Sequence, residues 1–277
     1  MKQSLSASLF VFLLTGWAYG QSDIRAVDFN NFTYLVQCIA ETPEKVTVKN
    51  GEFSMEKQEE GYVDRFYFKV LDVSFGDLNG DRRDEAIVLT VCNTGGTGYF
   101  SEGLIFSMKA GKPALVARIP CGDRADGGLR TTRVERGLLV VESNDPGEGG
   151  GACCPQVIIT TRYRLAGERI AQVGAETRRD IYPSEGLTFA PGTSGKTFKT
   201  TIEADQGKRF IVGARAGQTL TVSIDTDKAS LRLLEEADVN FGINNFLVRL
   251  PKTGDYTIEL QNNSDRELQV TVSIRIQ

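Results

Sequence analysis

The chain has 277 residues, contains no histidine and carries a net charge of −4 at neutral pH. Without an imidazole it cannot build a Ser-His-Asp triad, a Cys-His dyad or a histidine-ligated zinc site. No side chain in it has an unperturbed pKa near neutrality. The acidic balance does not attract a phosphate backbone, which argues against nucleic acid as a partner.

The first twenty residues have the pattern of a secretion signal. Lys2 supplies the basic start, Leu9–Leu14 an apolar run, and Ala18–Gly20 a small-residue cleavage site. The apolar run is too short to span a membrane comfortably, and no later segment approaches the required length. We therefore expect a periplasmic or secreted protein without a membrane span, whose mature chain begins after Gly20.

The remainder reads mainly as strands separated by Gly, Asp, Asn and Pro turns, with room for a short helix between Ile24 and about Thr42. Glu85–Cys92 is a nearly continuous apolar run, which is typical of a central strand buried on both faces. Other predicted strands are 103–108, 114–119, 137–142, 157–165 and 169–173. The last two flank an Ala-Gly turn and predict a hairpin.

A boundary is predicted near Ile181–Gly186, and a second β-unit follows it. In its final strand every second residue from Leu268 to Ile276 is apolar and the residues between them are polar. That alternation predicts a strand with one buried face. We therefore expect an all-β protein with two β-rich domains, residues 21–180 and residues 187–277.

The sharpest local motif is DLNGDRRDE, from Asp77 to Glu85. Oxygen side chains at alternate positions of a tight loop can converge on a hard cation, and a later carboxylate completes the shell. The motif resembles the calcium loop of FG-GAP integrin-type repeats. This resemblance implies Asp77, Asn79, Asp81 and Glu85 as side-chain ligands of calcium and the Arg83 carbonyl as a further ligand.

The sixth position of this motif departs from the calcium-loop pattern. Arg82 stands where a glycine is expected, and a positive φ is costly for a residue with a Cβ atom. The arginines at positions 82 and 83 also offset negative charge. The alternative interpretation is a turn that is derived from a calcium loop and no longer binds the ion.

Five cysteines follow the signal: Cys38, Cys92, Cys121, Cys153 and Cys154. Disulfides are the default in an exported protein. A bridge between the adjacent Cys153 and Cys154 strains the peptide between them, so we expect one or both to pair with Cys92 or Cys121. The sequence has neither a CxxC pair nor a histidine, which argues against a metal centre at these thiols.

Three loops are candidate binding surfaces, because binding residues often lie on loops at one end of a β-domain. They are Gly122–Gly128 with Asp123, Arg124 and Asp126, Pro146–Cys154, and Glu235–Asn245 with Phe241, Asn244 and Asn245. The alternative for each is a tight turn or a disulfide staple. The glycine-rich Thr94–Gly98 is interpreted as a loop, because a phosphate cradle needs a helix directly after it.

The last ninety residues resemble a known kind of domain. The segments Leu187–Ser194, Ala214–Val222 and Leu250–Ile258 carry FxxG, AGQxLxV and LPxTGDYxI in that order. This order is similar to pre-peptidase C-terminal domains and to bacterial periplasmic inhibitors of g-type lysozyme. The resemblance implies a β-sandwich for this part and transfers no binding residue. The stretch from Asp28 to Pro155 resembles an uncharacterised bacterial secreted domain.

Together these patterns predict a non-catalytic exported envelope protein that binds a protein or a cell-wall ligand, with lysozyme inhibition as its most specific form. Calcium is the one cofactor expected. An accessory or structural envelope protein is a second interpretation. A carboxylate glycoside hydrolase is a third, because paired carboxylates cleave glycosides without histidine. No motif, however, places two carboxylates across a cleft.

Overall fold

The computed structural model describes residues 23–37, 44–120, 122–148, 150–151, 154–235 and 244–277; the predicted signal lies outside this part. The all-β prediction is confirmed. Helical structure in the described part is confined to two 3-10 turns, Ile24–Ala26 (η1) and Phe29–Asn31 (η2). Among the described residues no helix has the length and apolarity to cross a membrane.

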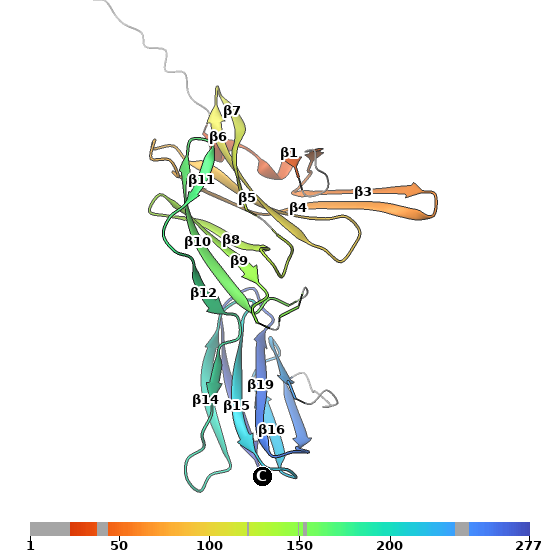
Figure 1. Cartoon of the computed structure of the whole chain (residues 1–277), viewed down its shortest axis with the longest axis vertical. Helices are drawn as coiled ribbons and strands as arrows, with labels where there is room; N and C mark the ends of the chain where they lie inside the picture. The colour runs from red at the N-terminus through yellow and green to blue at the C-terminus, as the bar shows by residue number, and fades with distance from the viewer. Residues whose placement is uncertain (1–22, 38–43, 121, 149, 152–153, 236–243) are drawn as a thin grey trace, which may run out of the picture.

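The largest sheet follows the chain from strand to strand. Its order is β3 (Glu52–Glu59), β4 (Tyr62–Gly76), β5 (Glu85–Asn93), β6 (Phe100–Lys109) and β7 (Lys112–Ile119), and all its pairings are antiparallel (Figure 1). Tight turns join β3 to β4 and β6 to β7, as antiparallel pairing permits, and longer loops join β4 to β5 and β5 to β6. The strands predicted at 103–108 and 114–119 are therefore present as β6 and β7.

A second sheet packs against this first one. Its order is β11 (Arg169–Gln172), β10 (Val157–Ala166), β9 (Leu138–Asp145) and β8 (Leu129–Glu135), and β12 (Thr177–Asp180) pairs with the start of β10. The predicted hairpin is confirmed as β10–β11. A small ribbon of β1 (Thr33–Val36) and β2 (Glu44–Thr47) lies with η1 and η2 on the other side of the first sheet.

The central strand β5 is buried on both faces, as predicted. Ala86 and Val88 belong to the core beneath η1, η2 and the β1–β2 ribbon, whereas Ile87 and Leu89 belong to the core shared with β8, β9 and β10. The second sheet approaches closely at Gly76, where a Cβ atom would lie 2.7 Å from the side chain of Val134. A glycine is therefore needed where these two sheets meet.

The C-terminal part is a β-sandwich, as expected. One sheet has the order β13 (Ser184–Gly186), β15 (Gly207–Ala214), β19 (Gly254–Asn262), β17 (Ala229–Leu233); the other has β14 (Gly195–Ile202), β20 (Leu268–Ile276), β16 (Thr219–Ile224), β18 (Asn245–Arg249). The two sheets enclose one core that contains Phe210, Val222 and Ile258. Along β20 the buried and less buried residues alternate strictly, which confirms the predicted strand.

We call residues 23–180 the N-terminal unit and residues 181–277 the C-terminal unit. Backbone and side-chain hydrogen bonds join them: Ile181 N–H donates to the Gln156 carbonyl at 2.8 Å, and Arg209 Nη2 donates to Gln156 Oε1 at 3.0 Å. Gly207 packs on the ring of Tyr182, where a Cβ atom would come within 2.5 Å. The described apolar cores do not cross this polar joint. Independent folding of the two units stays a prediction.

Candidate functional site

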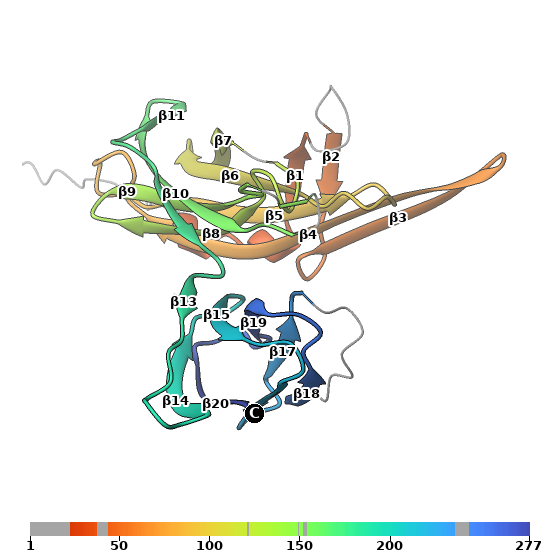
Figure 2. The same cartoon turned by 60° about the horizontal axis from the view of Figure 1, so that its bottom comes forward.

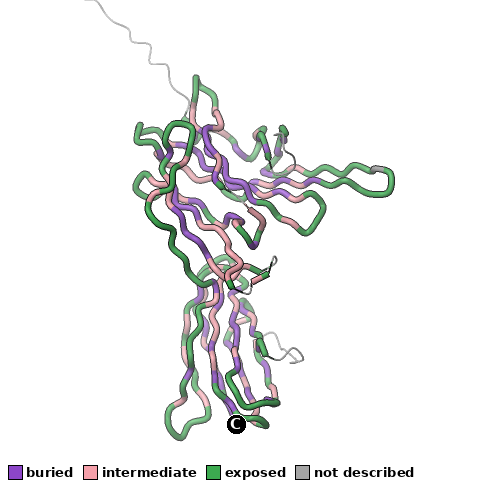
Figure 3. Tube along the Cα trace, viewed as in Figure 1, coloured by how far each residue is buried: buried purple, intermediate pink, exposed green. Residues whose placement is uncertain are grey.

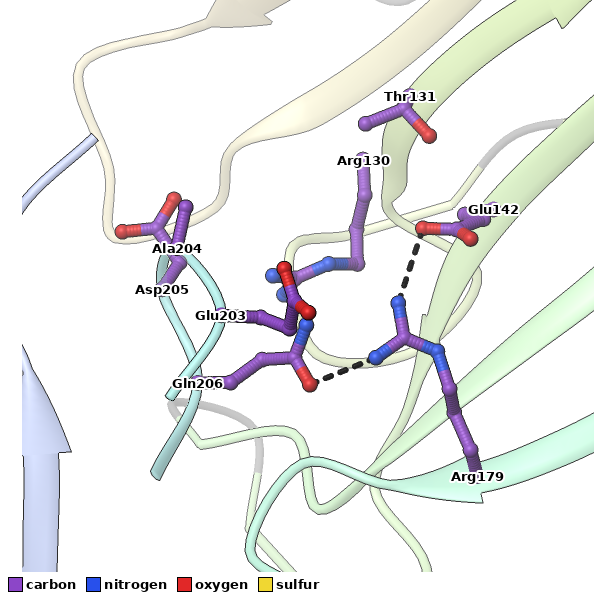
Figure 4. Close-up of a pocket in the computed structure, with 8 residues that line it drawn as sticks. All are labelled: Arg130, Thr131, Glu142, Arg179, Glu203, Ala204, Asp205 and Gln206. Carbon is purple, nitrogen blue, oxygen red and sulfur yellow. Dashed lines mark hydrogen bonds and ion pairs between the residues drawn. The ribbon is translucent and has the colours of Figure 1, made fainter. Parts of the chain in front are cut away.

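A polar pocket of about 410 Å³ lies at the joint of the two units; we call it the interunit pocket (Figure 4). The N-terminal unit lines it with side chains from β8, β9 and β12, and the C-terminal unit with the turn between β14 and β15. The residues are Arg130, Thr131, Glu142, Arg179, Glu203, Ala204, Asp205 and Gln206. The pocket is therefore assembled from segments that are far apart in the sequence.

Arg179 links the two walls of this pocket. Its Nη2 lies 3.3 Å from Glu142 Oε2 on β9, and its Nη1 donates to Gln206 Oε1 on the β14–β15 turn at 2.6 Å (Figure 4). Glu142 Oε1 is also 3.5 Å from Arg133 Nη1. These contacts satisfy Arg179 and Glu142 within the protein.

Arg130 is placed differently. Its Nη1 donates to the neutral Asn144 Oδ1 at 3.0 Å, and no ion pair joins it to a carboxylate in the described part of the chain. Burial lowers the pKa of Arg130 below its ordinary value, although the negative charge of Asp205 opposes that shift. A partly buried guanidinium therefore faces the pocket with donors that no carboxylate of the described chain takes up.

No local motif marks this pocket in the sequence. Arg130, Glu142 and Arg179 stand on polar positions of ordinary strands, and Asp205 stands in an ordinary turn. None of these four residues was therefore predicted as a site residue. The positive φ of 53° at Asp205 marks a tight turn, but this angle is known only from the structure.

The Asp77–Glu85 loop is a compact set of turns held by its own carboxylates. Asp77 Oδ1 accepts from the Gly80 N–H at 2.6 Å, and Asp77 Oδ2 accepts from the Arg82 N–H at 2.8 Å. Arg82 has a φ of 68°, so it takes the left-handed conformation that the motif normally assigns to glycine. Desolvation raises the pKa of Asp77, but the backbone N–H groups of Gly80, Arg82 and Asn79 outweigh it and hold that pKa below its ordinary value.

Glu85 closes the loop from inside the protein. It is fully buried, its Oε2 accepts from the Leu78 N–H at 2.9 Å, and its Oε1 accepts from Asn79 Nδ2 at 2.8 Å and from Ser107 Oγ at 2.9 Å. Burial raises the pKa of Glu85, and the hydrogen bonds from Leu78 and Ser107 offset only part of that effect. Glu85 therefore anchors the loop to β6.

The five predicted calcium ligands lie in this one loop. The side-chain oxygens of the four acidic and amide residues among them are engaged by neighbouring N–H groups and, at Glu85, also by the Ser107 hydroxyl. Asp81 Oδ1 accepts from the Arg83 N–H at 2.8 Å, and Asn79 Oδ1 accepts from the Asp81 N–H at 2.8 Å. In the described part of the chain, no three or more Asp, Glu or Cys side chains converge as metal ligands would. Calcium binding by the loop stays a prediction.

The cysteine predictions also stay open, because Cys38, Cys121 and Cys153 lie outside the described residues. Cys92 is buried at the end of β5, and Cys154 is exposed beside Gly151. Both have interaction partners. The expected bridge from Cys153 or Cys154 to Cys92 or Cys121 therefore awaits chemical mapping.

The first predicted binding loop, Gly122–Gly128, is tightly held. Asp123 Oδ1 accepts from the N–H groups of Tyr99 and Arg124, both at 2.8 Å, and Arg124 Nη2 donates to the Thr97 carbonyl at 3.0 Å. Asp123 is thus a turn-forming residue, whereas the side chains of Arg124 and Asp126 are exposed. The alternative interpretation, a tight turn, fits Asp123 better than a role in binding.

The other two loops lie on different units. The segment Pro146–Cys154 follows β9, and residues 149, 152 and 153 of it lie outside the described part of the chain. The end of β9 contacts the Gly122–Gly128 turn, because the Gly127 N–H donates to the Asn144 carbonyl at 2.8 Å. In the C-terminal unit, Asn244 accepts from the Ile224 N–H at 2.9 Å and Asn245 begins β18. Phe241 lies outside the described residues.

A hairpin formed by β3 and the first half of β4 projects well beyond the rest of the molecule (Figures 1 and 2). We call residues 54–66 the arm. On one face, the buried Phe66 lies directly opposite Met55, which is 40% exposed. Tyr62, 63% exposed, lies farther out on the same face, beyond the paired Lys57 and Asp64. The arm is mostly exposed toward its tip (Figure 3). Tyr62 is therefore a large aromatic side chain that stands in the solvent near the end of the arm.

No protein-family model and no curated protein matches the sequence. Several solved structures show a partial likeness, and three of them are periplasmic inhibitors of g-type lysozyme. The protein from Aeromonas hydrophila is 20% identical, covers 35% of this chain and 97% of its own, and has a TM-score of 0.31. The protein from Salmonella Typhimurium is 18% identical, covers 34% of this chain and 98% of its own, and has a TM-score of 0.30. A mutant of the Escherichia coli protein is 17% identical, covers 35% of this chain and 99% of its own, and has a TM-score of 0.29.

Proposed function

We propose that this chain is a non-catalytic exported envelope protein that binds a protein partner through the arm. The observation that carries the proposal is the arm itself, which holds Met55 and Tyr62 in the solvent on one face of a projecting hairpin. Aromatic and methionine side chains are enriched where proteins meet. Because the arm extends from the core beneath η1 and η2, it is a long, supported surface that can enter a partner's groove.

The non-catalytic part of the proposal rests on the titratable groups. The chain has no histidine. Among the described carboxyl groups, Glu85 has a raised pKa, as a general acid needs, but it is fully buried and engaged by Leu78, Asn79 and Ser107. A substrate cannot reach it. We expect purified protein to leave peptides, esters and peptidoglycan unchanged.

Inhibition of a lysozyme is the most specific form of the proposal, and the motifs of residues 187–277 support it. The test titrates the mature chain into g-type, c-type and i-type lysozyme assays. We expect inhibition of the g-type enzyme at micromolar protein. Lack of inhibition in all three assays would remove this form, and turnover of a glycan that disappears on mutating one carboxylate would overturn the non-catalytic assignment.

Variants locate the contact surface. We expect Tyr62→Ser with Met55→Ser to weaken inhibition by about tenfold or more, since an anchoring aromatic residue contributes at least about 1.4 kcal/mol. Leu71→Ser is the matched control, because Leu71 is 49% exposed on the same strand but outside the arm. If Asn244→Ala with Asn245→Ala weakens inhibition and the arm variant does not, the partner binds the C-terminal unit instead.

A further inference from the structure

We propose that the interunit pocket is a binding site for a small zwitterion, such as an amino acid or a short free peptide. Arg130 lies on the wall from the N-terminal unit, and Glu203 and Asp205 lie on the wall from the C-terminal unit (Figure 4). None of these three makes an ion pair in the described part of the chain. Opposite charges therefore line one pocket without neutralising each other by direct contact.

The charge pattern of the pocket disfavours ligands that carry charge of only one sign. Arg179 is already engaged by Glu142 and Gln206, so Arg130 is the guanidinium that remains for a ligand anion. A ligand with only negative charge would be repelled by Glu203 and Asp205, and one with only positive charge would be repelled by Arg130 and Arg179. A carboxylate and an ammonium group on one small molecule satisfy both walls at once.

The burial of Arg130 adds a driving force for the carboxylate end. A partly buried cation without an ion-pair partner is unfavourable, and a carboxylate that accepts two guanidinium hydrogen bonds removes that penalty. The neutral contact with Asn144 fixes the side chain through Nη1 and leaves its other donors for the ligand. Pre-positioning of this kind lowers the entropy cost of binding.

The size and place of the pocket agree with such a ligand. Its volume of about 410 Å³ is in the range of small-molecule sites, which occur preferentially between domains. Because its walls come from both units, a bound zwitterion holds β8 against the β14–β15 turn. The site is independent of the arm, so its test does not depend on the proposed protein partner.

The test is calorimetric titration of the mature protein with a free dialanine peptide, using N-acetylalanine and alaninamide as probes that keep only the negative or only the positive charge. We expect dialanine to bind at least about tenfold more tightly than either blocked probe. Dialanine of D-residues and dialanine of L-residues are titrated separately. The comparison distinguishes cell-wall peptides from protein-derived peptides as the source of the ligand.

Substitutions change the specificity in opposite directions. Arg130→Gln should lower dialanine affinity by about tenfold or more and abolish the preference for dialanine over alaninamide. Glu203→Gln with Asp205→Asn should abolish the preference over N-acetylalanine, and asparagine tolerates the positive φ at position 205. These switches in preference do not arise from misfolding.

Arg164→Gln is the control, because Arg164 is an exposed arginine of β10 away from the pocket. It should leave every affinity unchanged. Equal binding of dialanine and a blocked probe overturns the zwitterion assignment. Absence of dialanine binding up to about 10 mM overturns the site.

Discussion

The two units bury their apolar side chains in different ways. In the C-terminal unit, two four-stranded sheets face one core, so a strand such as β20 alternates between buried and less buried residues. In the N-terminal unit, the first sheet has a core on each face, and β5 is buried on both. An alternating pattern is therefore easy to interpret, whereas a continuous apolar run shows burial but does not identify the covering elements.

The largest expected effects come from removing one core side chain in each unit. We expect Ile87→Ala on β5 and Ile258→Ala on β19 each to lower the free energy of unfolding by about 2–5 kcal/mol, because both side chains are fully buried. Calorimetry should show two transitions, and each substitution should lower only one of them. Leu247→Ala, at a residue that is 65% exposed, is the matched control and should change neither.

A segment of residues 187–277 provides a second check of this comparison. It contains one complete core and should unfold cooperatively near the transition that Ile258→Ala affects. A broad, non-cooperative unfolding curve for this segment, or a simultaneous shift of both transitions in the full chain, would show that the polar joint couples the units into one cooperative structure.

Disulfide chemistry should distinguish the units next. All five cysteines of the sequence lie in the N-terminal unit. We expect at least one bridge that involves Cys153 or Cys154, and its loss should cost about 2–5 kcal/mol in that unit alone. Peptide mapping without reduction is the measurement. Recovery of both residues as free thiols from protein made in an oxidising compartment would refute the prediction.

Calcium should act on the N-terminal unit through the Asp77–Glu85 loop. If the loop binds the ion, calcium at about 100 times its Kd adds about 2.7 kcal/mol to the free energy of unfolding, so chelation should lower the melting temperature of this unit. Asp77→Ala with Asp81→Ala should abolish the dependence. Identical melting with calcium and with chelator would assign the loop to structure alone.

The smallest expected effect is a pH dependence from Glu85. Its pKa in the folded protein is raised above the ordinary value of 4.5, so the folded state holds the proton more tightly than the unfolded state. Ionised Glu85 therefore opposes folding, and its cost appears as the pH rises above 4.5. Compared with Glu85→Gln, the native chain should lose relative stability over that rise. Urea unfolding at several pH values measures the difference, and a constant difference would contradict the assignment.

Much of the fold was predictable because strand signals are local. The side chains of Val270, Val272 and Ile274 point to one side of an extended backbone whatever surrounds them, so their alternation was visible without coordinates. The Glu85–Cys92 run was likewise interpretable as a central strand. The arm was not predicted, because Met55 and Tyr62 lie among charged residues and their exposure depends on what the fold leaves uncovered.

The candidate sites show the same limit. The Asp77–Glu85 loop was recognisable because its residues are consecutive and bond to their own backbone. Even there, the structure was needed to show that Arg82 adopts a φ of 68° and that Glu85 is directed inward to Ser107. The predicted binding residues Phe241 and Asn245 belong to no comparable motif of consecutive residues in the sequence.

By itself, the sequence determined the strand periodicity, the turns, the missing imidazole and the acidic loop, because each depends on residues close together in the chain. The tertiary structure alone decided that Arg130, Arg179 and Asp205 line one pocket. Their meeting depends on how β8, β12 and the β14–β15 turn are brought together across the joint. Charges from separate units interact appreciably only when folding brings them close together, and no local pattern records that distance.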